Sequence, residues 1–260
     1  MTTAPPSWRR RAALAGGLAL AAGWVIGAPR LFSGSSALSF RDLPRLPGFR
    51  ALDAAGAVSA GAQSAFIGID AAPQASNRVT QREALRATPC AALFGDWPKG
   101  GAVPLAYFTD YNCPNCRVFE TRLANFEAGN AGAIRIIRHE FPLLGPPSVT
   151  AARAVLAAEM QGRYDAMHAR LISTRLVSDR ALMGAIAEDV GLDAARLLRD
   201  MDAPEVDRHL ARSKALADLF GFYGTPGAVL GRTAFMGAIP EATFVALVEE
   251  EASLSPLDCD

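Results

Sequence analysis

A Cys-Pro-Asn-Cys motif at positions 113–116 constrains the fold more than any other feature of this sequence. An apolar run typical of a buried strand (103–108) precedes it, and a run with helical character (117–126) follows. Two cysteines in a strand, turn and helix context indicate redox chemistry. A structural disulfide or a metal clip is the alternative, but tetrahedral metal sites usually need four ligands, and the sequence has only one such pair. We therefore expect a redox motif and no metal site.

The positions of the four residues predict different roles for the two thiols. Pro114 suits the first position of a helix, where a fixed φ and a missing N–H group cost nothing. Cys113 then lies at the helix N-terminus, where the helix dipole favours its thiolate and lowers its pKa below about 8.5. Cys116 lies one turn later and should be less exposed. We expect Cys113 to attack and Cys116 to resolve the mixed disulfide.

Composition and the N-terminal residues indicate where the protein acts. The chain has 260 residues, 50% of them hydrophobic, with 26 basic and 26 acidic residues, so nothing suggests binding to nucleic acid. Three arginines at 9–11 precede an apolar run at 12–28, which is typical of an export signal. Residues 1–37 are therefore predicted to be a cleaved signal peptide or an N-terminal membrane anchor. In both cases the folded part lies outside the cytoplasm.

The remaining chain divides into three further regions. Residues 38–78 are rich in Gly, Ala and Pro and predict a linker or N-terminal extension with at most a short hairpin. A helix interrupted by Pro89 is expected before the motif, and a buried strand (133–141) after it. The segment from Ser148 to Phe220 has an almost wholly helical pattern, and strands at 228–230 and 233–236 and a helix at 240–252 follow. The expected limits in the helical segment are Ser148 and Ser178 as caps, Gly191 as an end, Pro204 as a start, and a further helix from Tyr164 to Ile172.

This order of elements resembles a thioredoxin-like α/β fold with an inserted all-helical domain. The sequence YFTDYNCPNC at 107–116, the FPLLG at 141–145 with Ser148, and the GTPGAVLG at 224–231 resemble the DsbA family of exported thiol:disulfide oxidoreductases. The resemblance covers about residues 80–252. It implies a thioredoxin-like domain at 79–147 and 221–255 and a helical insertion at 148–220.

The resemblance also implies roles for individual residues. Cys113 and Cys116 match the attacking and resolving cysteines, with Pro114 and Asn115 between them. Pro226 matches a cis-proline that faces the disulfide, and the backbone of Thr225 would pair with a substrate peptide. An ordinary trans turn between neighbouring glycines is the alternative for Pro226.

Two positions depart from the family pattern. Asn115 replaces a histidine that often stabilises the thiolate in family oxidases, although an amide can still donate a hydrogen bond to sulfur. Tyr107 occupies a strand position where relatives commonly have a buried acidic residue thought to relay protons. Asp110 lies nearer the motif, and a turn-capping role is favoured there over a catalytic one.

The other cysteines, histidines and methionines are weaker candidates. Cys90 and Cys259 are predicted to pair as a structural disulfide, with free or buried thiols as the alternative. His139, His168 and His209 share no ligand spacing, so packing or surface roles are expected. The methionines of the helical segment are expected in its core rather than in a metal site: Met160, Met167, Met183 and Met201.

Together these features predict a periplasmic thiol:disulfide oxidoreductase without a bound cofactor. It is either released by signal cleavage or tethered to the membrane by residues 12–28. Oxidation of cysteines in exported proteins, with a membrane redox partner that recycles the motif, is the leading direction. A reductase or isomerase would use the same residues, and Asn115 and Thr225 keep that alternative open. A thiol chaperone for a soft metal ion such as Cu(I) is a further alternative.

Overall fold

The computed structural model describes residues 38–53, 56–60, 82–95, 101–175 and 179–255. Its centre is a six-stranded sheet in the order β1-β2-β6-β5-β3-β4. The central strands are β3 (Val103–Thr109), β4 (Ile134–Glu140), β5 (Gly227–Leu230) and β6 (Thr233–Met236). Strand β3 pairs in parallel with β4 and antiparallel with β5. Strand β5 pairs antiparallel with β6.

Helices cover both faces of this sheet, as alternation along β3 requires. Leu105 and Tyr107 point into one apolar core, whereas Ala106 and Phe108 point into another. Helices α4 (Pro114–Gly129) and α10 (Glu241–Ser253) supply the first core. The second contains α3 (Pro89–Phe94) and the C-terminal part of α9 (Pro204–Phe220). Because both faces are buried, β3 has no polar side, and its sequence is largely apolar up to Thr109.

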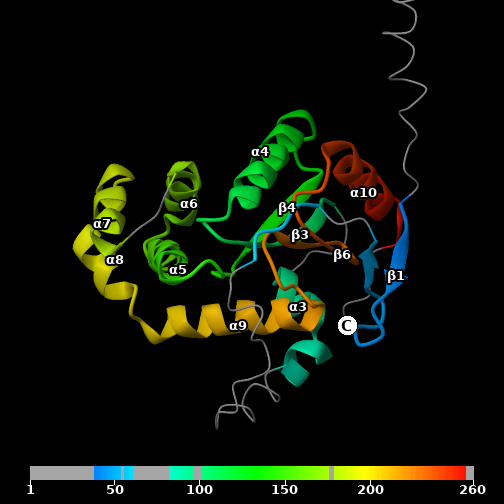
Figure 1. Cartoon of the computed structure of the whole chain (residues 1–260), viewed down its shortest axis with the longest axis horizontal. Helices are drawn as coiled ribbons and strands as arrows, with labels where there is room; N and C mark the ends of the chain where they lie inside the picture. Colours follow the sequence, from blue (N-terminus) through cyan, green and yellow to red (C-terminus); the bar gives the residue numbers. More distant parts are fainter. Residues whose placement is uncertain (1–37, 54–55, 61–81, 96–100, 176–178, 256–260) are drawn as a thin grey trace, which may run out of the picture. The chain divides into compact units, whose positions relative to one another are not determined.

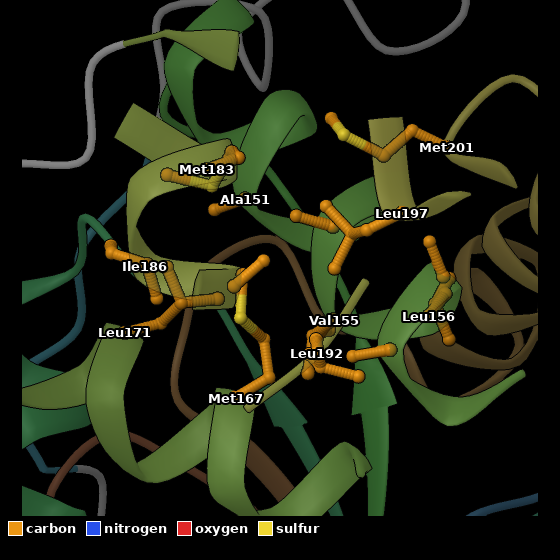
Figure 2. Close-up of a cluster of buried hydrophobic side chains, with 14 of the residues drawn as sticks. Ala151, Val155, Leu156, Met167, Leu171, Met183, Ile186, Leu192, Leu197 and Met201 are labelled. Atoms are coloured by element: carbon orange, nitrogen blue, oxygen red, sulfur yellow. The ribbon is translucent and has the colours of Figure 1, made fainter. Parts of the chain in front are cut away.

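Between β4 and β5 the chain is helical (Figure 1). This part consists of α5 (Pro146–Glu159), α6 (Tyr164–Ser173), α7 (Arg180–Asp189), α8 (Ala194–Asp200) and α9. Their apolar faces meet in a separate core, in which Met167, Met183 and Met201 are fully buried (Figure 2). Met160 is instead 41% exposed. The core role is therefore confirmed for three of the four methionines.

Most elements lie where the periodicity of the sequence predicts them. Residues 82–87 and α3 are two helical pieces that meet at Thr88, directly before Pro89, as the proline predicted. Gly191 follows α7 with a φ of 73°, which a C-terminal glycine accommodates without a Cβ clash. The short helix α8 was not predicted. Its cap is Asp193, whose side chain accepts a hydrogen bond from the Arg196 N–H.

Two predicted helix caps differ from the structure. Helix α5 begins at Pro146 after Gly145, whose φ of 99° suits glycine, and Ser148 lies within the first turn. The Ser148 hydroxyl is buried and accepts a hydrogen bond from Asn112 Nδ2 at 3.4 Å, so Ser148 is not the cap. Helix α7 is capped by Asp179, and Ser178 lies outside the described residues.

The segment predicted as a linker or N-terminal extension contributes two strands to the sheet. Strands β1 (Phe40–Asp42) and β2 (Arg50–Leu52) pair antiparallel, and β2 pairs in parallel with β6. Arg50 donates hydrogen bonds to the Thr233 hydroxyl and to the buried Glu251 carboxylate, which ties this hairpin to α10. Residues 1–37, the predicted signal or anchor, lie outside the described residues. Within the described part, no helix is long and apolar enough to cross a membrane.

Candidate active site

The Cys-Pro-Asn-Cys motif lies at the start of α4, where the chain leaves β3. Cys113 is the N-cap residue, and Pro114 occupies the first helical position, as predicted. The Cys116 N–H, which has no helical partner at this position, donates a hydrogen bond to Cys113 Sγ at 3.0 Å. The local sequence therefore places the unpaired Cys116 N–H where it can donate to Cys113 Sγ.

A second segment reaches the motif from 112 residues further along the chain. Phe108 of β3 pairs with Gly227 of β5, which places the preceding Thr225-Pro226 bond beside the turn that carries Cys113. This peptide bond is cis, as expected from the resemblance, so the alternative of a trans turn is wrong. Cys113 Sγ lies 3.5 Å from the Thr225 carbonyl oxygen, to which the thiol can donate a hydrogen bond.

The two thiols differ in acidity. A hydrogen bond from the Cys116 thiol has the largest influence on the pKa of Cys113. Together with the Ser59 hydroxyl, the Thr225 side chain and the Cys116 N–H, it lowers this pKa to about 6, although burial acts in the opposite direction. Burial and the neighbouring Cys113 sulfur raise the pKa of Cys116 well above its usual value. Cys113 is therefore the thiolate near neutral pH, and Cys116 keeps its proton.

The two thiols do not differ in exposure as the sequence predicted. Both side chains belong to residues that are 0% exposed. Cys116 is covered because it faces inward from α4, whereas Cys113 is covered by residues that approach from elsewhere in the chain. The distinction between the thiols is thus one of hydrogen bonding rather than of access.

Ser59 is the site residue that the sequence did not indicate. Its N–H donates to the Thr225 carbonyl at 2.7 Å, and its carbonyl accepts from the Thr225 N–H at 2.8 Å. The Asn115 amide donates to the Ser59 hydroxyl at 3.0 Å rather than to a cysteine sulfur. The Asn115 amide therefore reaches Cys113 through Ser59. No sequence spacing relates Ser59 to the motif, since the approach depends on pairing of distant backbone segments.

Tyr107 and Asp110 have structural partners near the motif. The Tyr107 hydroxyl donates to the Cys116 carbonyl at 3.3 Å and accepts from the Thr109 hydroxyl at 3.3 Å. Burial is the largest of the effects that raise the pKa of Tyr107, so this phenol keeps its proton. The Asp110 carboxylate accepts from the N–H groups of Asn112, Leu143 and Leu144. The predicted turn-capping role of Asp110 is confirmed.

A buried polar network behind the motif was also not predicted from the sequence. His168 contacts the Tyr111 hydroxyl at 2.9 Å and the Glu120 carboxylate at 3.0 Å. The Glu120 carboxylate lies 3.3 Å from the Arg138 guanidinium. Burial alone would raise the pKa of Glu120, but His168 and Arg138 outweigh it and lower this pKa.

Glu140 completes this network on the sheet side. It accepts hydrogen bonds from the Tyr111 and Tyr164 hydroxyls. Burial nevertheless raises the pKa of Glu140 to about 8. The network joins α4, α6 and β4 across sequence separations that no local pattern reveals.

The other predicted residues lie away from the motif. His139 is buried, stacks on Phe108 and contacts the Leu93 carbonyl at 2.9 Å, which confirms a packing role. Cys90 is buried in α3, whereas Cys259 lies outside the described residues, so their pairing stays a prediction. Among the residues that the structure describes, no group of three or more His, Cys, Asp or Glu side chains could hold a metal ion.

Comparison with known proteins gives a consistent picture. The model of the DSBA-like thioredoxin domain matches residues 105–249. A thioredoxin-like oxidoreductase from Silicibacter pomeroyi DSS-3 is 36% identical and superimposes with a TM-score of 0.58, over 63% of this chain and 98% of that one. No curated protein matches the chain.

Two further solved structures are more distant. The catalytic domain of Proteus mirabilis ScsC is 26% identical, with a TM-score of 0.56 over 66% of this chain and 99% of that one. A periplasmic thioredoxin-like protein from Salmonella enterica serovar Typhimurium is 28% identical, with a TM-score of 0.52 over 63% of this chain and 95% of that one. The residues that the DSBA-like thioredoxin domain matches include the motif and the Thr225-Pro226 turn.

Proposed function

The chain belongs to the family of DSBA-like thioredoxin domains, which are thiol:disulfide oxidoreductases, and from this premise we propose that it oxidises paired cysteines of exported proteins. In the oxidised enzyme, Cys113 and Cys116 form one disulfide. A substrate thiolate attacks Cys113 Sγ, and the bond to Cys116 breaks. Cys116 leaves with the electron pair and takes up a proton, in keeping with its raised pKa.

The second half of the reaction releases the product. A second substrate thiolate attacks the substrate sulfur of the mixed disulfide, and Cys113 leaves as a thiolate. Two electrons have then passed from the substrate thiols to the motif, and the substrate contains a new disulfide. A thiol of lower pKa is the better leaving group, so the lowered pKa of Cys113 favours this step.

The pKa of Cys113 is the single observation that supports the oxidising direction. A thiolate stabilised in the reduced enzyme makes the disulfide easier to reduce and hence more oxidising. A pKa of about 6 lies between the pKa values of two reference thiols, about 7 in thioredoxin and about 3.5 in DsbA. We expect a reduction potential between their values of about −270 and −120 mV.

Location and recycling complete the proposal. The arginines at 9–11 and the apolar run at 12–28 support export, and one relative is a periplasmic protein. We place the enzyme in the periplasm, where exported proteins acquire disulfides. A membrane redox partner would reoxidise the motif after each turnover.

The test is transfer of a disulfide to a reduced, unfolded protein that contains two cysteines. The oxidised wild type should generate the substrate disulfide and end with two reduced thiols in the motif. Cys113→Ser should be inactive. Cys116→Ser, mixed with a substrate that already contains a disulfide, should accumulate a mixed disulfide at Cys113, because Cys113 opens the substrate disulfide and the resolving thiol is missing. Equal reactivity of both reduced thiols toward an alkylating reagent would contradict these roles.

Equilibration with glutathione determines the direction. A potential near that of thioredoxin would favour the reductase or isomerase that uses the same residues, for which the uncharged Asn115 is the supporting observation. Stoichiometric Cu(I) in the purified protein would favour the thiol chaperone instead.

A further inference from the structure

Residues 56–60, hereafter the strap, lie along the backbone that carries the Thr225-Pro226 turn. The strap forms two antiparallel bridges, Ser59 with Thr225 before β5 and Ala57 with Ala238 after β6. Four backbone hydrogen bonds of 2.7–3.0 Å hold it: Gly56 N to Met236 O, Ala238 N to Ala57 O, Ser59 N to Thr225 O and Thr225 N to Ser59 O. The strap thus uses the hydrogen-bonding groups of Thr225 that an added peptide strand would need.

Glycines allow this close approach. A Cβ atom on Gly237 would lie 2.2 Å from the Gly56 carbonyl group, and one on Gly56 would lie 2.4 Å from the Ala238 carbonyl carbon. At Gly224 a Cβ atom would lie 3.0 Å from the Ser59 carbonyl oxygen. Side chains at these positions would push the strap away, so the sequence on both sides of the contact suits its docking.

The strap also covers the reactive sulfur. The Ser59 hydroxyl accepts from Asn115 Nδ2 at 3.0 Å, and its interaction with the Cys113 sulfur lowers the pKa of Cys113. Cys113 is 0% exposed, although its proposed reaction requires a second sulfur to reach it in line with the disulfide. An attacking thiol is normally at least partly accessible. Something must therefore move before Cys113 can react, and Ser59 is in direct contact with it.

The strap itself is suited to moving. Ala57 and Ala60 are exposed, and Val58 and Ser59 are only half-buried, so undocking exposes little apolar surface. Among the described residues, its polar contacts are the four backbone bonds, the Asn115 contact and the contact of Ser59 with Cys113, all of which an incoming peptide could replace.

We propose that the strap is a built-in substitute for the substrate, in which Ser59 occupies the position of the substrate cysteine. The proposal rests on the proposed function and specifies its ligand: an extended, cysteine-containing segment that pairs antiparallel with Thr225. A substrate binds by displacing the strap, and its thiolate then attacks Cys113 Sγ with Cys116 as the leaving group. Serine cannot form the mixed disulfide, so the strap occupies the site without reacting.

Alkylation of reduced Cys113 by iodoacetamide tests the covering role. Ser59→Pro removes the N–H that donates to Thr225 and should accelerate alkylation between about threefold and tenfold, the equilibrium effect of one typical hydrogen bond. Ala60→Pro adds the same ring at the next, exposed position and should react like wild type. If Ser59 only stabilised the thiolate, its loss would raise the pKa of Cys113 and slow the reaction at neutral pH. A slower or unchanged rate in Ser59→Pro would overturn the proposal.

An introduced thiol tests the position of Ser59. In a Cys116→Ser background with oxidised glutathione, Cys113 first forms a mixed disulfide with glutathione and releases one reduced glutathione. In Ser59→Cys the thiol at position 59 should then attack Cys113 Sγ, release the second glutathione and close an internal disulfide, identified by peptide mapping. In Ala60→Cys, where the side chain points to the opposite side of the strap, the glutathione adduct should remain. Persistence of the adduct in Ser59→Cys would also overturn the proposal.

The substrate assay separates this proposal from the proposed function. Ser59→Pro should oxidise a short cysteine peptide faster than wild type, and Ala60→Pro should not. If wild type oxidises the peptide but Ser59→Pro is no faster, the strap proposal fails and the function stands. If alkylation accelerates in Ser59→Pro while neither protein oxidises any thiol, the strap does cover Cys113 and the function fails.

Discussion

At the scale of single residues, Cys113 and Cys116 ionise differently although both are fully buried. Burial alone would raise both pKa values. The difference arises because Cys113, at the N-cap of α4, accepts hydrogen bonds from the Cys116 thiol, the Cys116 N–H and the Ser59 hydroxyl. Cys116 lies within the helix and mainly donates. The position of each sulfur relative to the helix start therefore decides which one is the thiolate.

Replacement of Cys116 tests this account. The alkylation rate of wild-type Cys113 should rise with pH to a plateau with a midpoint near 6, because only the thiolate reacts. Cys116→Ala removes the largest stabilising donor and should move the midpoint upward, toward the ordinary value of about 8.5. Cys116→Ser keeps a hydroxyl donor and should move it less. A midpoint that is the same in all three proteins would show that the Cys116 side chain does not stabilise the thiolate.

At the scale of elements, the polar network between β4, α4 and α6 fixes the helical segment to the sheet behind the motif. Glu140 receives the Tyr111 and Tyr164 hydroxyls, but its Oε2 has no hydrogen-bond partner among the described residues. Burial raises the pKa of Glu140 to about 8. The folded protein therefore binds a proton at Glu140 more tightly than the unfolded chain does, since an unperturbed Glu has a pKa of about 4.3.

A pH dependence of stability follows from this shift. The contribution of protonated Glu140 is complete below about pH 4 and is lost as pH rises toward 8, because the unfolded chain releases the proton first. The loss is on the order of 3–5 kcal/mol for a fully buried group. Glu140→Gln keeps an acceptor for both tyrosines without titrating. Its unfolding free energy, measured by urea denaturation, should fall less than that of wild type between about pH 5 and 8, a range that lies within this titration.

The matched control is the exposed Glu188 of α7. Glu188→Gln removes the same charge from the surface and should leave the wild-type pH dependence unchanged. Parallel curves for wild type and Glu140→Gln would show that Glu140 titrates in the folded protein as it does in the unfolded chain.

At the scale of the whole molecule, the sheet brings together segments that lie far apart in the sequence. The hairpin of β1 and β2 pairs with β6 about 180 residues later, and Arg50 ties it to Glu251. The predicted disulfide between Cys90 and Cys259 would add a covalent closure. In the chain-entropy model, a loop of well over 100 residues corresponds to about 5 kcal/mol of stabilisation.

Thiol counting tests this disulfide. A variant that carries Cys113→Ser and Cys116→Ser retains only Cys90 and Cys259. In denaturant without reductant it should have no alkylatable thiol, and two after reduction. Reduction should also lower its melting temperature, because the unfolded chain gains conformational entropy. Two reactive thiols before reduction would show that the cysteines do not pair.

The sequence alone determined the features that depend on neighbouring residues. The strand before the motif, the proline at the first position of α4, the interruption at Pro89 and the Asx turn of Asp110 are local, because each follows from side-chain periodicity or from a backbone hydrogen bond within a few residues. The resemblance to the DsbA family added Thr225 and its cis peptide bond to Pro226, which no local rule places beside Cys113.

Only the tertiary structure decided what surrounds the reactive sulfur. Ser59 reaches Cys113 because its segment pairs with distant backbone before β5 and after β6, and glycines such as Gly237 leave room for that approach. The partners of Glu140 likewise come from the turn after β3 and from α6. Local patterns cannot specify such contacts, since pairing between segments depends on which strands are neighbours in the sheet and in what register. The residues of the motif and their neighbours in sequence determine its chemistry, whereas the tertiary fold determines which molecules can reach it.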